Sequence, residues 1–182
     1  MILSSHAIVG AAIARVLPTH PFLAFGLGVM SHLLLDAIPH WQYPLRSVQR
    51  STGSIGNRAL DRHGPHLYHD MFLVAGDALL GILVGWLIFP PVSQIGIWTS
   101  ALTIFGSLLP DGLTFLYVWE QPPSPNRGGW EGWHIKPLAY FRRFHLWFHA
   151  RDRRLENNPA LGIPLQIAII AIVAFAIYFF HP

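Results

Sequence analysis

The sequence contains no cysteine and few charged residues. Only 12% of its 182 residues are Asp, Glu, Lys or Arg, against about 25% in a typical soluble domain. The lack of cysteine excludes disulfide bonds and thiolate metal ligands, and leaves histidine and carboxylate side chains as the main candidates for holding a metal ion. An apolar content of 52% and a mean hydropathy of +0.40 indicate a membrane protein.

Apolar runs predict the helices. Three runs, 71–89, 95–119 and 161–180, are long enough to cross a hydrocarbon layer of about 30 Å. Two shorter runs, 7–17 and 22–35, predict a helical hairpin that turns at Pro18-Thr19-His20-Pro21. The predicted fold is therefore all-α: a polytopic helical membrane protein with about five membrane-embedded helices and one interfacial amphipathic helix.

We expect a single helical membrane domain over residues 1–182. Residues 1–120 would form its core, 121–160 a cytoplasmic loop with an interfacial helix, and 161–182 a C-terminal transmembrane helix. Basic residues cluster in 36–70 and 120–160, while 90–94 carries no charge. The positive-inside rule then places both basic regions in the cytoplasm and predicts a multi-pass protein of the plasma (inner) membrane.

Residues 137–155 predict the interfacial helix. One face would carry Tyr140, Phe144 and Trp147, and the other faces Arg142 and His149. This helix is either a plain anchor or a docking site for headgroups, with Arg142 and His149 as candidate headgroup contacts. Next to apolar spans, such basic residues favour anionic lipid over nucleic acid as the partner. The sequence does not predict an oligomeric state.

The segment 31–41 carries the strongest functional signal. His32 and Asp36 are four residues apart, and so project from one helix face about one turn from each other. They end an apolar run, where an unpartnered charge costs roughly 2.5–3.5 kcal/mol at membrane depth. An imidazole and a carboxylate at this spacing can bind one divalent cation, with His40 as a third ligand after the Pro39 break. The open alternative is a buried hydrogen-bonded pair that fixes two helices.

Further candidates fall at the same predicted membrane face. His6, His66 and Asp70 are candidate ligands, and Asp77 and Asp111 are candidates for a general base or for orienting the ligands. Asp77 could instead hydrogen-bond a neighbouring helix, and His66 could be solvated. A weak internal similarity between 28–39 and 103–114 aligns Asp36 with Asp111, which favours two hairpins with a site between them.

These motifs resemble those of the membrane-bound metal-dependent hydrolases, a family of inner-membrane proteins. The resemblance covers roughly residues 1–120, and its motifs follow the reverse order along this chain. The matching segments are Ser5-His6, Ser31-His32 through Asp36, Arg62-His63-Gly64-Pro65-His66 and Leu108-Leu109-Pro110-Asp111. His32, Asp36 and Pro39-His40 also look like the zinc-binding helix of the all-α phospholipase C and single-strand nuclease fold, in which the Asp bridges two ions.

The resemblance implies a hydrolase with one or two Zn²⁺ ions, or Mn²⁺ or Fe²⁺, acting on a phosphoester of a lipid or lipid-linked substrate. A phosphate would then contact Arg62. Two other classes stay open: a non-enzymatic protein whose buried polar groups fix helix packing, and an ion or proton transporter that uses Asp77 and Asp111. The outer halves of the spans are almost entirely apolar, which disfavours the transporter.

Overall fold

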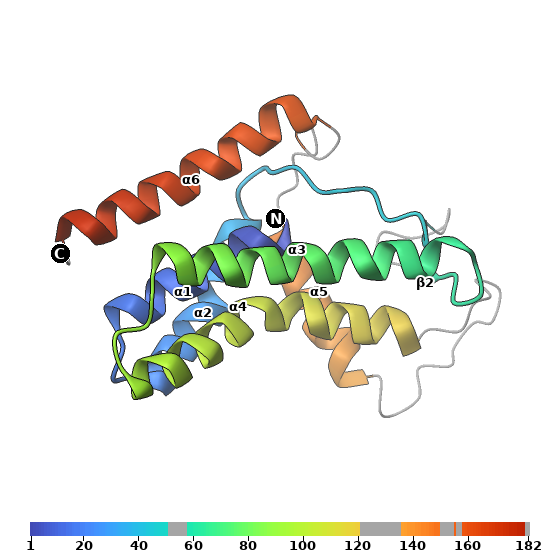
Figure 1. The fold of residues 1–182 in the computed structure, drawn as a ribbon. Coiled ribbons are helices and arrows are strands. Elements are labelled where there is room, and N and C mark those ends of the chain that lie inside the picture. Colours follow the sequence, from blue (N-terminus) through green and yellow to red (C-terminus); the bar gives the residue numbers. More distant parts are fainter. Residues whose placement is uncertain (51–57, 121–135, 150–154, 156–157, 181–182) are drawn as a thin grey trace.

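The computed structural model describes residues 1–50, 58–120, 136–149, 155 and 158–180, and in these ranges the chain is all-α apart from one small hairpin (Figure 1). The elements are α1 (Leu3–Val16), α2 (Pro21–Asp36), β1 (Val48–Arg50), β2 (Arg58–Leu60), α3 (His66–Ile88), α4 (Gln94–Glu120), α5 (Lys136–Phe148) and α6 (Pro159–Phe180). The two strands pair antiparallel, with Val48 opposite Leu60. This hairpin was not predicted, because three-residue strands leave almost no periodic signal.

Each predicted apolar run lies on a helix, and the all-α class is confirmed. Three helices, α3, α4 and α6, are long and apolar enough to cross a membrane. α1 and α2 have 14 and 16 residues, short of the about 20 that a span needs. Three of the five predicted membrane-embedded helices therefore reach spanning length. The predicted loop at 121–132 lies outside the described residues.

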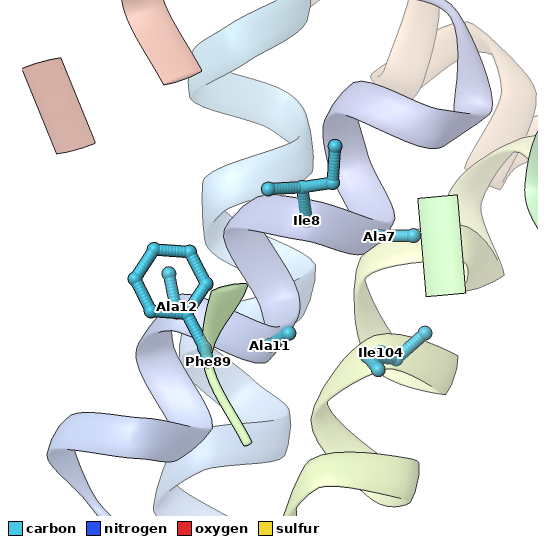
Figure 2. Packing of buried hydrophobic residues seen from close by; sticks show 6 residues of the cluster. All are labelled: Ala7, Ile8, Ala11, Ala12, Phe89 and Ile104. Atoms are coloured by element: carbon cyan, nitrogen blue, oxygen red, sulfur yellow. The ribbon is translucent and has the colours of Figure 1, made fainter. Parts of the chain in front are cut away.

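α1 is the helix around which the others are arranged, because it packs against α2, α3, α4 and α6. Ten of its 14 residues are buried. The core cluster around it combines small α1 side chains with two larger residues from outside the helix (Figure 2). Its members are Ala7, Ile8, Ala11, Ala12, Phe89 and Ile104. Small side chains let helix backbones approach closely. Helices in a bilayer associate in this way, because the hydrophobic effect does not drive them together there.

Glycines mark the closest approaches between helices. A Cβ added at Gly28 of α2 would lie 2.5 Å from the carbonyl oxygen of Thr103 in α4. A Cβ at Gly106 of α4 would lie 2.7 Å from the carbonyl oxygen of Phe25 in α2. Backbone cannot yield as a flexible side chain does, so α2 and α4 hold their present distance only while both positions lack a side chain.

Gly28→Ala is expected to lower the free energy of unfolding by about 1–3 kcal/mol, the usual cost of overpacking. Gly26→Ala in the same helix is the matched control, because a Cβ there meets nothing within 4 Å. Thermal unfolding followed by circular dichroism in detergent measures both variants. Equal melting temperatures for the two alanine variants would contradict the close approach of α2 and α4.

α5 turns its polar side toward the bundle and its aromatic side outward. Arg142 and His145 are 6% and 3% exposed, and α5 packs against α2 and α4. Tyr140 and Trp147 are 67% and 68% exposed on the other side. The predicted amphipathic helix is present from Lys136 to Phe148, and residues 150–154 of the predicted range lie outside the described residues. Its place at the membrane surface stays a prediction.

α6 runs obliquely across the view in Figure 1 and contacts the bundle through residues from Gln166 to Tyr178. Gln166 is 2% exposed in an otherwise apolar helix, and its side-chain amide forms hydrogen bonds with several partners. Its Oε1 accepts from the Ser5 hydroxyl, and its Nε2 donates to the carbonyl oxygen of Trp41 at 3.1 Å. A Cβ at Gly162, one turn earlier, would run into Trp41. Through Gln166, α6 is hydrogen-bonded both to the start of α1 and to the segment that follows α2.

Candidate metal centre

Asp36, the last residue of α2, lies at the centre of a buried group of histidines. Its side chain is 1% exposed. Its carboxylate oxygens lie 3.0 Å from His145 Nε2, 3.2 Å from His32 Nε2 and 3.3 Å from His6 Nε2. These imidazoles come from α5, α2 and α1. Three segments far apart in the sequence therefore bring nitrogen ligands to one carboxylate.

Two sets of residues in this cluster have the geometry to hold a metal ion. We call them the first group (His32, Asp36, Asp111 and His145) and the second group (Asp36, His40 and His149). Within each group one ligand atom per residue lies within 4.8 Å of all the others. Asp36 belongs to both, so its two oxygens can serve neighbouring ions.

The outer nitrogens of two histidines are fixed by carbonyl groups. His32 Nδ1 donates to the Ser107 carbonyl oxygen at 2.7 Å, and His40 Nδ1 donates to that of Ile38 at 2.6 Å. Because a carbonyl only accepts, each Nδ1 carries a proton, and this hydrogen bond turns each Nε2 toward Asp36. Metal-binding histidines are held in this way. Ser107 stands one turn from Pro110, where the sequence predicted available carbonyls in a distorted helix.

His32 and His145 meet nitrogen to nitrogen. Their Nε2 atoms are 3.2 Å apart, and His145 Nδ1 lies 3.0 Å from the Thr114 hydroxyl. A contact this short requires a hydrogen or a metal ion between the two nitrogens, because two lone pairs facing each other would repel. Either one would sit against Asp36.

His6 distinguishes these two possibilities. It is 0% exposed and stacks on His32 with ring centroids 4.0 Å apart. Neither ring nitrogen has a hydrogen-bond partner among the described residues, because the approach of Nε2 to Asp36 is not directed along a hydrogen bond. A buried polar group left unsatisfied costs about 1–3 kcal/mol. A metal ion beside Asp36 would give His6 Nε2 its missing partner.

The second group is more open. His149 is 28% exposed, and its Nε2 lies 4.0 Å from Asp36. Burial lowers the pKa of His149 to about 4 and also lowers the pKa of His40. Both rings are therefore neutral near pH 7, the form that binds metal. In the first group Asp111 is 35% exposed, so the cluster has one side open to its surroundings.

The structure brings together most of the residues predicted for the site. They are His6, His32, Asp36, His40 and Asp111, joined by His149, which was predicted to contact a headgroup. Asp111 lies 3.8 Å from His32 Nε2 and is thus a candidate ligand as well as a candidate base.

His66, Asp70 and Asp77 do not join either group among the described residues. All three are on α3, which packs on α1. Gly81 of α3 meets Ser4 at the start of α1, so His66 and Asp70 lie further along α3, beyond that end of α1. Asp70 instead accepts from the backbone and hydroxyl of Ser47, and Asp77 accepts from the Ser4 amide at 3.2 Å. His66 is exposed at the first turn of α3. The prediction of His66 and Asp70 as ligands and of Asp77 as a general base is corrected, and the alternative that Asp77 hydrogen-bonds a neighbouring helix is confirmed.

Two predicted phosphate or headgroup contacts are packed on aromatic rings. The Arg142 guanidinium lies 5.0 Å from the ring centroid of Tyr117 and is buried, so its prediction as a headgroup contact is wrong. Arg62 lies 5.5 Å from the ring centroid of Trp119, and its phosphate contact stays a prediction. Both pairs are cation–π contacts that hold peripheral segments to α4.

His145 is the candidate ligand that the sequence analysis did not identify. It lies on the predicted interfacial helix, where only Arg142 and His149 were singled out, as headgroup contacts. The available signal was the His145/His149 spacing of four residues, which puts both imidazoles on one face, together with Arg142 three residues before His145. Only the docking of α5 on α4 shows that this face points inward.

Comparison with family models, curated proteins and solved structures gives no match for this chain.

Proposed function

We propose that this protein is a membrane-bound metal-dependent hydrolase that cleaves a phosphoester of a lipid or lipid-linked substrate. The observation that supports the metal site is His6, a fully buried imidazole beside Asp36 whose two nitrogens have no hydrogen-bond partner among the described residues. The resemblance of the motifs to membrane-bound metal-dependent hydrolases and to the phospholipase C fold supports the reaction class.

Zinc fits the ligand set best. The first group offers two imidazoles and two carboxylates without thiolate, a set that also accepts Mn²⁺ or Fe²⁺. A bound ion of this kind supplies a Lewis acid that activates water and offsets charge developing on phosphoryl oxygens. The second group shares Asp36 and would hold a second ion.

Asp111 has the position of a general base. It is the one member of the first group that is partly exposed, at 35%, and so is reachable by water and by substrate. Water would attack phosphorus, Asp111 would accept a proton from that water, and the P–O bond to the alcohol would break with protonation of the leaving oxygen. The lipid part of the substrate would lie along the exposed aromatic side of α5, near Phe144 and Trp147.

We also propose that α1 and α2 are embedded in the bilayer together with the three spanning helices, making five. Their short length and the burial of α1 by the other helices support a shallow position. The arginine distribution supports a plasma-membrane protein with the metal centre at the cytoplasmic face.

The test combines metal analysis with turnover. Detergent-purified protein is expected to retain about one or two zinc per chain and, in vesicles, to release phosphate-containing headgroup from a phospholipid panel or to cleave a generic phosphodiester. Asp111→Asn should reduce turnover by about 10²–10⁴-fold, the usual contribution of a general base. Asp77→Asn is the matched control, since Asp77 lies outside both groups, and should retain turnover. Equal losses in both variants would remove Asp111 from this role.

A non-enzymatic scaffold is the second candidate. The observation in its favour is that Asp36 already accepts from the Met1 nitrogen and contacts several imidazoles, so hydrogen bonds alone can satisfy it. Stoichiometric zinc with no turnover on any phosphoester would favour a metal-stabilised scaffold. Protein without zinc and without turnover would favour a hydrogen-bonded one.

A further inference from the structure

Gln42, on the segment between α2 and β1, lies against the second group. Its Nε2 is 2.9 Å from His40 Nε2 and 3.0 Å from His149 Nε2. The Met1 nitrogen is 2.8 Å from the same His40 Nε2. Two nitrogens that could bind an ion thus converge on a side-chain amide.

The direction of these hydrogen bonds follows from the donors and acceptors present. A glutamine Nε2 carries two hydrogens and no lone pair, so it donates one hydrogen to each imidazole. His40 Nδ1 already donates to the Ile38 carbonyl, which leaves His40 Nε2 as an acceptor. His149 Nε2 lies 3.0 Å from the same amide nitrogen, which can only donate, so His149 Nε2 accepts as well. The amide thus satisfies the two lone pairs that a cation would otherwise take.

We propose that the Gln42 side chain occupies the position of the second ion and makes the second group a conditional divalent-cation site. This inference rests on the metal centre of the proposed function. The Met1 nitrogen contacts Asp36, which both groups share, but no side-chain amide contacts the imidazoles of the first group among the described residues, so that group fills first. A second ion binds only after the Gln42 amide leaves His40 and His149.

The surrounding structure allows the side chain to move while the backbone stays. Gln42 belongs to no helix or strand and is partly exposed. The residue before it, Trp41, is held by Gln166 of α6 through its carbonyl group. His40 is held through Nδ1 by Ile38. A rotation of Gln42 would therefore free His149 without displacing either imidazole, and would free His40 once the Met1 nitrogen also withdraws.

Zinc titration of the purified full chain tests this, with bound zinc measured by elemental analysis after equilibrium dialysis. Wild type is expected to bind one zinc tightly and a second at least about tenfold more weakly, because the second ion must break two hydrogen bonds. Gln42→Ala should tighten the second step about tenfold and leave the first unchanged. Gln94→Ala, an exposed glutamine at the start of α4, is the matched control and should behave as wild type.

Gln42→Glu is the second variant, because a carboxylate at this position becomes a ligand and should tighten the second step further. An unchanged or weaker second step in both Gln42 variants overturns this inference while the metal centre stands. Equal affinity of both steps in wild type overturns it as well. Absence of zinc binding in wild type, in Gln42→Ala and in Gln42→Glu overturns the proposed function itself.

Discussion

Asp36→Asn is expected to abolish zinc binding at both groups. Asp36 is the one residue that the two groups share, and it is 1% exposed. Asparagine keeps the size of the side chain but removes its charge and replaces one acceptor oxygen with a donor. The donor would then face His145 Nε2 or the Met1 nitrogen, so both ions lose their common ligand. Elemental analysis of purified protein should fall from about one or two zinc per chain to none.

Asp70→Asn is the control for this substitution. Asp70 stood beside Asp36 as a ligand in the sequence interpretation, but its carboxylate accepts from Ser47. The variant should keep its zinc and lose about 1–3 kcal/mol of unfolding free energy, as expected when a buried carboxylate bonded to neutral donors is altered. Loss of zinc in Asp70→Asn, or its retention in Asp36→Asn, would contradict the site described above.

The helices and half of the site follow from local sequence patterns. The apolar runs locate five helices to within a few residues, since a membrane-embedded helix needs an almost continuous apolar stretch. His32 and Asp36 follow from their spacing of four residues, because both the pattern and the contact lie on one helix. Signals of this kind need no knowledge of how helices pack.

The rest depends on tertiary packing. His66 and Asp70 repeat the spacing of a ligand pair, yet neither belongs to a group that could hold a metal ion in the part of the chain that the structure describes, and Asp70 accepts from Ser47 instead. His145 resembles an interfacial residue in the sequence, but the cation–π contact of Arg142 with Tyr117 lies on the face of α5 that packs on α4. The sequence alone does not show which of two equally amphipathic faces is turned inward. That choice separates a headgroup contact from a metal ligand.

The alignment of Asp36 with Asp111 has a physical counterpart. The two segments of the weak internal similarity lie on α2 and α4, which pack closely where Gly28 meets Thr103. One turn further along both helices, His32 donates to the Ser107 carbonyl oxygen. The carboxylates of Asp36 and Asp111 then both belong to the first group. Close glycine packing therefore sets the distance between the ligands as well as the stability of the helix pair.

His6→Leu is expected to change stability and metal binding in opposite directions. In metal-free protein the variant removes a buried imidazole whose two nitrogens have no hydrogen-bond partner among the described residues. Its free energy of unfolding should therefore rise by about 1–3 kcal/mol, the cost of such unsatisfied groups. Zinc affinity should fall by more than the about 10–100-fold that the loss of an outer-shell partner costs, because a ligand is gone. Denaturant unfolding with and without zinc measures both effects.

The opposite sign of the two effects is what separates a metal ligand from a structural histidine. If a protonated His6 stabilised Asp36 by itself, His6→Leu would destabilise the metal-free protein, since a buried ion pair that loses one partner leaves a charge uncompensated. His20→Leu serves as the control: His20 is exposed before α2, and its replacement should change neither quantity by more than about 0.5 kcal/mol. If His6→Leu is more stable than wild type without zinc and also binds zinc more weakly, then the buried His6 nitrogens serve the metal ion and not the stability of the metal-free protein.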